Sequence, residues 1–199
     1  MQTAITRGTL AEVLGPRDGL GLRVKQMALV LAGIAMLTLA AKIRVPMWPV
    51  PITMQTFAVL TLGAAYGARL GLLTLVCYLA LGAAGASVFT GESSGLAYMA
   101  GPTGGYLIGF AVAAAVVGRL AHRGWSRSVT GMVTALLIGN AVIYALGLPW
   151  MAYLFLAEKG AAWVMQWGMT NFLLGDALKL VLAALLIPAL WKLVGDARG

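Results

Sequence analysis

Two oppositely charged side chains, Asp176 and Lys179, lie three residues apart in an apolar stretch near the C-terminal end of the chain. The stretch reads LLGDALKLVL over residues 173–182, and this pair provides its only ionisable groups. Residues at this spacing share one face of a helix and can touch. The carboxylate can accept hydrogen bonds from paired N–H donors, and the ammonium group can bind an anionic group. The pair is therefore a candidate site for a ligand that carries such groups.

The composition indicates the medium in which this pair lies. Hydrophobic residues make up 61% of the 199 residues and charged residues only 10%, whereas a soluble domain carries about 25% charged residues. Several apolar runs reach the roughly 17 to 25 residues that a transmembrane helix needs. The short alternating segments of outer-membrane strands do not occur in the sequence. We therefore expect an all-α integral membrane protein in a lipid bilayer.

The apolar runs predict six transmembrane helices in one bundle. These spans cover about 25–42, 53–67, 70–86, 104–121, 129–148 and 168–194. We expect residues 149–167 to form a loop with a short interfacial helix. Residues 1–22 mix charges, glycine and proline and lack the apolar core of a signal peptide. They are expected to form a cytoplasmic tail in front of a six-helix membrane domain over residues 23–199.

The basic residues predict the orientation of this bundle. Those on one side of the predicted spans are Arg7, Arg17, Arg23, Lys25, Arg69, Arg119, Arg123, Arg127, Lys192 and Arg198. The other side holds only Lys42, Arg44 and Lys159. Because positively charged loops face the cytoplasm, we expect both termini inside the cell. An anionic membrane surface then explains the net charge of +8, and no nucleic acid partner is needed.

In this topology Asp176 and Lys179 lie in the outer half of the membrane, about 12 Å and about 16 Å deep at the helical rise per residue. One interpretation is structural: the charges neutralise each other, or Lys179 bonds to loop carbonyls. However, each intramembrane charge costs roughly 3 kcal/mol, and a buried ion pair is weak evidence of stability. We therefore favour a ligand site.

The first outer loop supplies further candidate residues. Three prolines within residues 45–56 exclude a helix and favour an extended path. Thr53 and Gln55 then place polar side chains at the outer end of the second span. Trp48 is either a ligand contact or an interfacial aromatic residue, and the sequence leaves both interpretations open.

A second outer segment, residues 87–106, combines glycines with the aromatic residues Phe89, Tyr98 and Tyr106. Glycines permit close approach of the backbone, and aromatic rings supply flat faces for a ring-shaped ligand. Packing in the core or at the membrane interface is the alternative explanation for these rings. Both segments lie on the same side of the membrane as the outer half of the last span.

Three separated stretches, in this order, resemble the BioY family, the biotin-binding S component of energy-coupling factor (ECF) transporters. They read VPMWPVPITMQTFAVLTLGAAYGARLG, GPTGGYLIGF and GDALKLVLAALL, and the similarity covers about residues 25–195. The resemblance implies six helices, cytoplasmic termini, and biotin bound near the outer face under the first loop. It also implies that Asp176 and Lys179 contact the ligand, and that Gly91 lies near it. We expect Asp176 to accept from the ureido N–H groups and Lys179 to bind a carboxylate or carbonyl oxygen.

The resemblance also implies partners. No GxxxxGK[ST] phosphate-binding loop occurs in the sequence, so ATP-driven uptake needs other subunits. Ala28 and Ala32 form a small-xxx-small pair on the first span, which either packs within the bundle or contacts the transmembrane T component. We expect that T component and two ATPase subunits as partners. The expected location is the bacterial cytoplasmic membrane.

Several alternatives remain open. The chain is either such an S component or a vitamin carrier that works without ATPases, as a solitary secondary carrier or as a homo-oligomer. An intramembrane enzyme that uses Asp176 and Lys179 as acid and base is a different class, but His122 is the only histidine and falls on a cytoplasmic loop. We identify no catalytic residue, metal ligand set or cofactor, and biotin is expected as a transported ligand. A structural membrane subunit is the remaining alternative and predicts no ligand.

Overall fold

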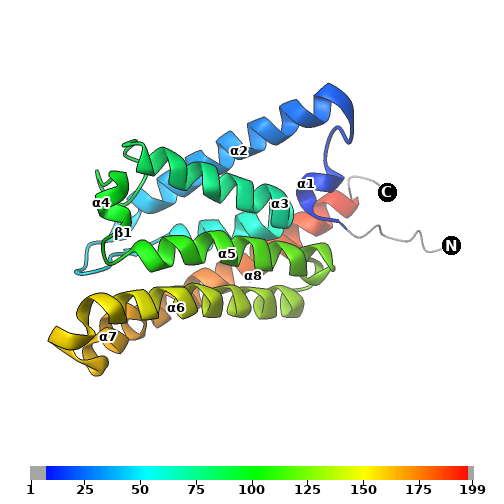
Figure 1. The fold of residues 1–199 in the computed structure, drawn as a ribbon. Helices are drawn as coiled ribbons and strands as arrows, with labels where there is room; N and C mark the ends of the chain where they lie inside the picture. The colour runs from blue at the N-terminus through cyan, green and yellow to red at the C-terminus, as the bar shows by residue number, and fades with distance from the viewer. Residues whose placement is uncertain (1–7, 197–199) are drawn as a thin grey trace.

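The computed structural model describes residues 8–196, which form a helical bundle with a short β-hairpin at one end (Figure 1). The elements in chain order are α1 (Leu10–Val13), α2 (Gly19–Lys42), β1 (Arg44–Val45), β2 (Ile52–Thr53), α3 (Gln55–Ala83), α4 (Gly95–Met99), α5 (Gly104–His122), η1 (Trp125–Arg127), α6 (Val129–Lys159), α7 (Ala161–Gly168), η2 (Thr170–Phe172) and α8 (Leu173–Asp196). The all-α class expected from the composition is confirmed.

Five helical segments within residues 8–196 are long and apolar enough to cross a membrane, whereas the sequence predicts six spans. The difference arises in α3, which contains two predicted spans. Gly67 has non-helical backbone angles, φ +81° and ψ 173°. A Cβ on Gly71 would lie 3.5 Å from the Cα of Gly63, although eight residues of straight helix span about 12 Å. The chain therefore folds back at Gly67, where the sequence predicts a turn.

Helix α6 corrects the prediction for residues 149–167. The sequence predicts a loop after residue 148, but α6 continues through Pro149 to Lys159. Proline removes one backbone hydrogen bond in a helix, and membrane helices tolerate this loss because neighbouring groups compensate. Gly160, with φ +80°, separates α6 from the short helix α7. The structure thus has a longer helix and a short second one where a loop with one interfacial helix was expected.

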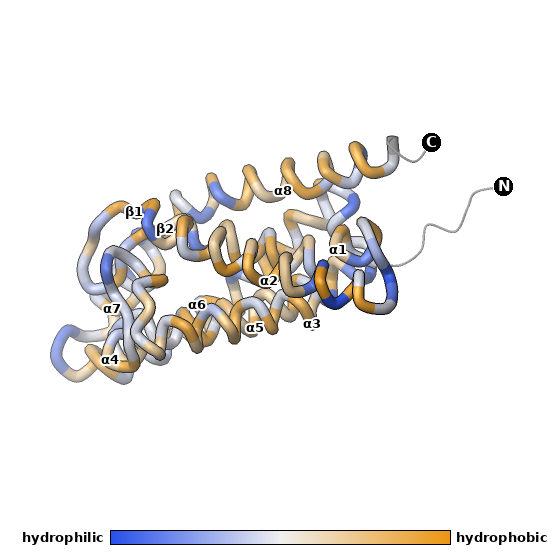
Figure 2. The backbone as a smooth tube through the Cα atoms, turned by 90° about the horizontal axis from the view of Figure 1, so that it is seen from above, coloured by the Kyte–Doolittle hydropathy of each residue, from blue (hydrophilic) through white to orange (hydrophobic). Residues whose placement is uncertain are grey.

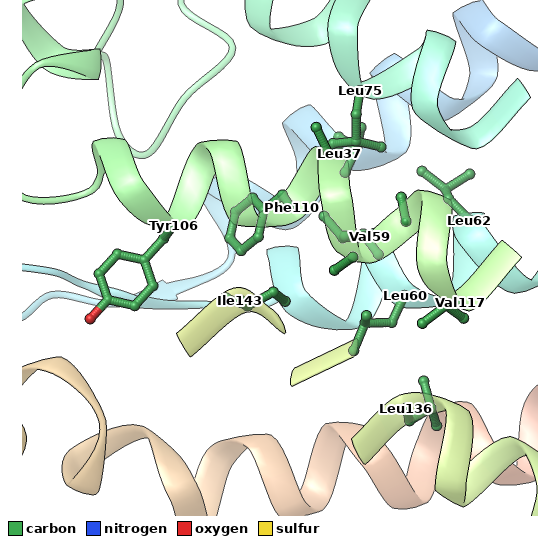
Figure 3. Close-up of a cluster of buried hydrophobic side chains, with 14 of the residues drawn as sticks. Leu37, Val59, Leu60, Leu62, Leu75, Tyr106, Phe110, Val117, Leu136 and Ile143 are labelled. Carbon is green, nitrogen blue, oxygen red and sulfur yellow. The ribbon is translucent and has the colours of Figure 1, made fainter. Parts of the chain in front are cut away.

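Helix α5 lies at the centre of the bundle and packs against α3 and α6 (Figure 1). A Cβ on Gly63 of α3 would lie 2.7 Å from the carbonyl oxygen of Ala114 on α5, so only glycine permits this approach. Buried aliphatic side chains from several helices interdigitate around α5, as Val59, Val117 and Leu136 do in Figure 3. This core fixes the relative positions of the helix ends that form the site.

The two ends of the bundle differ in their polar contacts. At one end, the α1 end, Glu12 lies 3.2 Å from Nδ1 of His122, and Trp191 Nε1 of α8 donates to Ser126 Oγ at 3.1 Å. The opposite end, the hairpin end, holds β1 and β2 with α4 and α7 (Figure 1). Figure 2 shows hydrophobic residues along the helices between these ends and hydrophilic segments near both.

The segment predicted as a cytoplasmic tail is structured in part. Helix α1 and the first residues of α2 lie within residues 1–22. Lys25 Nζ donates to the carbonyl of Leu14 at 3.0 Å and so ties the connection between α1 and α2 to the bundle. Residues 1–7 and Arg198, which the orientation prediction uses, lie outside the described residues.

Candidate ligand-binding site

A cavity lies at the hairpin end, between the β1–β2 hairpin and the adjoining parts of α3, α5, α6 and α8. The space that no protein atom fills is about 530 Å³, its open mouth included. The lining residues are Val50, Pro51, Thr53, Gln55, Thr56, Thr90, Tyr98, Thr103, Tyr106, Leu107, Phe110, Ile143, Tyr144, Phe172, Asp176 and Lys179. Apolar and aromatic walls with a few convergent polar groups are typical of a small-molecule site.

Asp176 and Lys179 lie on the wall of this cavity as an ion pair, with 3.1 Å between Oδ1 and Nζ. They are only 7% and 8% exposed. Thr56 on α3 connects the two, because its hydroxyl donates to Asp176 Oδ1 at 3.3 Å and accepts from Lys179 Nζ at 3.1 Å. Tyr144 on α6 donates to Asp176 Oδ2. Three helices therefore hold the charged pair in one hydrogen-bonded network.

The local sequence of α8 explains why this pair faces inward. Leu174, Leu178 and Leu182 occupy the other side of the helix and are 77%, 63% and 54% exposed. Charged groups are costly in contact with lipid, whereas leucine is favoured there. The helix therefore turns its leucines outward and its charged pair toward the cavity. The prediction that Asp176 and Lys179 share one helix face and touch is confirmed.

Gln55 and Thr53 contribute a second polar group to the cavity. Thr53 Oγ1 donates to Gln55 Oε1 at 3.2 Å, and Gln55 Nε2 donates to the Tyr78 hydroxyl at 2.9 Å. Tyr78 in turn donates to the carbonyl of Val88 at 2.8 Å. These bonds orient the Gln55 amide, which still has donor and acceptor capacity for a ligand.

Aromatic side chains form much of the remaining wall. The Tyr106 hydroxyl donates to the carbonyl of Gly168 at 2.6 Å, which joins α5 to the end of α7. Its ring packs edge-to-face against Tyr144, with 6.5 Å between the ring centroids. Tyr106 and Phe110 project from α5 near Ile143 of α6 in Figure 3. Together with Phe172 these rings offer apolar faces to a ring-shaped ligand.

Three predicted ligand residues do not line this cavity. Trp48 is 63% exposed and packs against Trp163, with ring centroids 5.7 Å apart. Phe89 is fully buried and stacks on Tyr98 at 5.2 Å, so it supports a wall residue from behind. Gly91 lies in the segment before α4 with φ +61°. A ligand contact by these three residues stays a prediction.

Several residues of the cavity were not predicted from the sequence. Thr56 directly follows Gln55, and its position at the start of a span was a usable signal. Tyr144 is a hydroxyl-bearing residue in the middle of an apolar run, which was a second signal. Thr90 and Thr103 occur in loop or helix-cap positions, where threonine is common and gives no hint of a site.

The arrangement is suited to the binding of an amphiphilic molecule. The charged network presents a donor and an acceptor side by side, and the aromatic and aliphatic walls accommodate an apolar ring. Within residues 8–196 no group of three or more His, Cys, Asp or Glu side chains is placed to hold a metal ion. The polar and apolar groups that line the cavity can recognise a ligand by hydrogen bonds and by apolar contact.

Comparison with known proteins finds a matching family and several relatives. The sequence pattern of the BioY family matches residues 9–196. The chain is 36% identical over 169 residues to the probable biotin transporter BioY of Pyrococcus horikoshii, which covers 85% of this chain and 98% of that protein. It is 36% identical over 167 residues to the biotin transporter BioY of Thermotoga maritima, and this match covers 83% of this chain and 96% of that protein.

The fold is similar to the crystal structure of the S-component for biotin from an ECF-type ABC transporter. The TM-score is 0.75 and the identity 23%, and the match covers 88% of this chain and 95% of that chain. At this level of identity the likeness shows the fold. The family match and the two relatives together show that this chain belongs to the BioY family.

Proposed function

We propose that this chain captures biotin with high affinity and serves as the substrate-binding S component of an ECF-type transporter for biotin uptake. The observation that carries the proposal is the buried Asp176–Lys179 pair on the wall of a largely apolar cavity, in a chain of the BioY family. Two relatives that cover most of the chain are named as biotin transporters, one of them as probable.

The chemistry of biotin matches the groups in the cavity. Its ureido ring carries two N–H donors and a carbonyl, its fused rings are apolar, and its side chain ends in a carboxylate. Oδ1 of Asp176 already accepts from Lys179 and Thr56. Oδ2 accepts from Tyr144 and has a second lone pair for a ureido N–H. Because Lys179 Nζ lies beside this carboxylate, it meets the same end of the ligand and binds the ureido carbonyl oxygen.

The proposed topology has six membrane crossings, with the two arms of α3 counted separately. The hairpin end and the cavity then face the outside, and the α1 end faces the cytoplasm. The described basic residues Arg23, Arg69, Arg119 and Arg123 support this orientation under the positive-inside rule. The location is the bacterial cytoplasmic membrane.

The proposed partners are a transmembrane T component and two ATPase subunits. Ala28 and Ala32 of α2 are exposed, whereas the adjacent Gly33 is buried, and a Cβ there would lie 2.6 Å from Thr74 Cγ2. The small alanines therefore face away from the bundle, together with Met27 and Leu31 at 66% exposure each. Small residues on an exposed helix face permit close approach of a partner helix, which supports contact with the T component.

Uptake of radiolabelled biotin into proteoliposomes tests this function. Vesicles that contain the chain, the T component and both ATPases are expected to accumulate biotin when ATP is supplied. Vesicles with the chain alone are expected to bind biotin without accumulating it. Accumulation by the chain alone identifies a solitary carrier and contradicts the S-component role. Absence of binding contradicts biotin capture itself.

A further inference from the structure

We propose that the hydroxyl of Thr103 donates a hydrogen bond to the carboxylate of biotin and so determines specificity for the anionic end of the ligand. Thr103 precedes the first residue of α5 and lines the cavity. This inference rests on the proposed function and adds the residue that recognises the end of biotin opposite to the ureido ring.

The hydroxyl of Thr103 is not used by the protein itself. A threonine in the position before a helix normally accepts a hydrogen bond from an N–H of the first turn. Here the backbone of Thr103 is helical, with φ −81° and ψ −11°, and the side chain makes no such bond. The residue is 9% exposed, and its Oγ1 has no hydrogen-bond partner within the described part of the chain. A buried hydroxyl without a partner is costly, so its position on the cavity wall points to a ligand.

The surroundings of Thr103 favour an anionic ligand group. The N-terminus of a helix carries partial positive charge, and the N–H groups of its first turn lack acceptors inside the helix. The 19 residues of α5 begin directly after Thr103. Tyr106, Leu107 and Phe110 line the same cavity, so the first two turns of α5 face the ligand. A carboxylate is stabilised at such a helix end, particularly beside a hydroxyl donor.

The position of Thr103 suits a ligand whose ureido ring is bound by Asp176. The ring of Tyr144, which donates to Asp176, packs against Tyr106. Thr103 lies three residues before Tyr106, about 4.5 Å closer to the hairpin end at the helical rise. Helix α5 starts at that end of the bundle (Figure 1). The ureido ring therefore lies deeper, and the valerate chain leads outward along α5 to Thr103.

Titration calorimetry with biotin and its uncharged methyl ester tests this assignment on the full chain in detergent. Thr103→Val preserves the side-chain shape and removes the hydroxyl. We expect it to weaken biotin binding about tenfold and ester binding only about threefold, because hydrogen bonds to charged groups are roughly twice as strong as neutral ones. Thr134→Val is the matched control, since Thr134 is exposed on α6 and bonds its own helix; it is expected to bind both ligands like the wild type.

Two comparisons decide the outcome. Asp176→Asn is expected to weaken the binding of biotin and of the ester equally, since both ligands carry the ureido ring. The assignment of Thr103 is overturned if Thr103→Val loses the same affinity for both ligands or keeps wild-type affinity for both. It is also overturned if Asp176→Asn loses much more affinity for biotin than for the ester. A wild-type chain that binds neither ligand refutes the proposed function instead. Thr103→Val is expected to unfold thermally at the wild-type temperature or above, because no partner loses a bond.

Discussion

Replacement of Lys179 by methionine tests the role of the charged pair most specifically. Methionine has similar length and removes the ammonium group, which bonds Asp176 Oδ1 and Thr56 Oγ1, both at 3.1 Å. A hydrogen bond from a charged group contributes about 1.5–3 kcal/mol. If Lys179 binds the ureido carbonyl, its loss lowers biotin affinity by about 10- to 150-fold.

The same substitution also affects folding, and the two effects can be separated. Lys179→Met leaves the Asp176 carboxylate buried at 7% exposure without its cation. Removal of one partner of a buried pair costs about 3–5 kcal/mol of stability. The double variant Asp176→Asn with Lys179→Met removes the uncompensated charge, so we expect stability to recover while biotin affinity stays low.

Calorimetry and thermal unfolding in detergent measure these two effects on the same preparations. Lys159→Met is the matched control, because Lys159 forms an exposed pair with Glu158 at 2.7 Å. Such surface pairs contribute at most about 1 kcal/mol, so this variant is expected to bind and unfold like the wild type. Wild-type biotin affinity in Lys179→Met refutes the assignment of Lys179 to the ligand.

Three further predictions concern separate parts of the structure. Tyr144→Phe removes the hydroxyl that donates to the buried Asp176 carboxylate. Because a hydrogen bond to a charged group is lost, calorimetry is expected to show about tenfold weaker biotin binding. Unchanged biotin affinity contradicts a role of this network in ligand binding. Gly67→Ala forces a side chain into a backbone conformation open only to glycine and costs about 1–3 kcal/mol, seen as a lower unfolding temperature. Gly195→Ala is its control, because a Cβ at Gly195 meets nothing within 4 Å. Equal unfolding temperatures of the two variants argue against the chain reversal at Gly67 in α3. Ala32→Trp is expected to abolish co-purification with the T component while biotin binding is retained. Leu73→Trp, at an exposed position of α3, is its control. Co-purification of the Ala32→Trp variant with the T component excludes this face of α2 as the contact.

The charged pair was predictable because two ionisable groups in an apolar run are costly and their spacing fixes a common helix face. The residues that complete the network were not predictable in the same way. Thr56 and Asp176 are separated by 120 positions, and Tyr144 and Asp176 by 32. Their contacts depend on how α3, α6 and α8 pack, and no periodic pattern encodes that packing. A single hydroxyl in an apolar helix therefore reveals its role only in the fold.

The error at the end of α6 has a similar origin. Pro149 and Trp150 read as the start of a loop, because proline disrupts helices. In the structure Pro149 is exposed within α6, and Trp150 Nε1 donates to the carbonyl of Gly101 at 2.9 Å. This tertiary contact helps to hold the helix beyond the proline. By contrast, the turn at Gly67 is local, since only glycine readily adopts its positive φ, and the sequence predicts it at the observed position.

Biotin capture through Asp176 is tested most directly by calorimetric titration of biotin into the purified full chain in detergent, beside Asp176→Asn. The wild type is expected to bind one biotin per chain tightly, and the variant is expected to bind at least about tenfold more weakly, a loss of about 1.4 kcal/mol. A monodisperse wild-type chain that does not bind biotin, or a variant that binds as tightly as the wild type, contradicts biotin capture through Asp176.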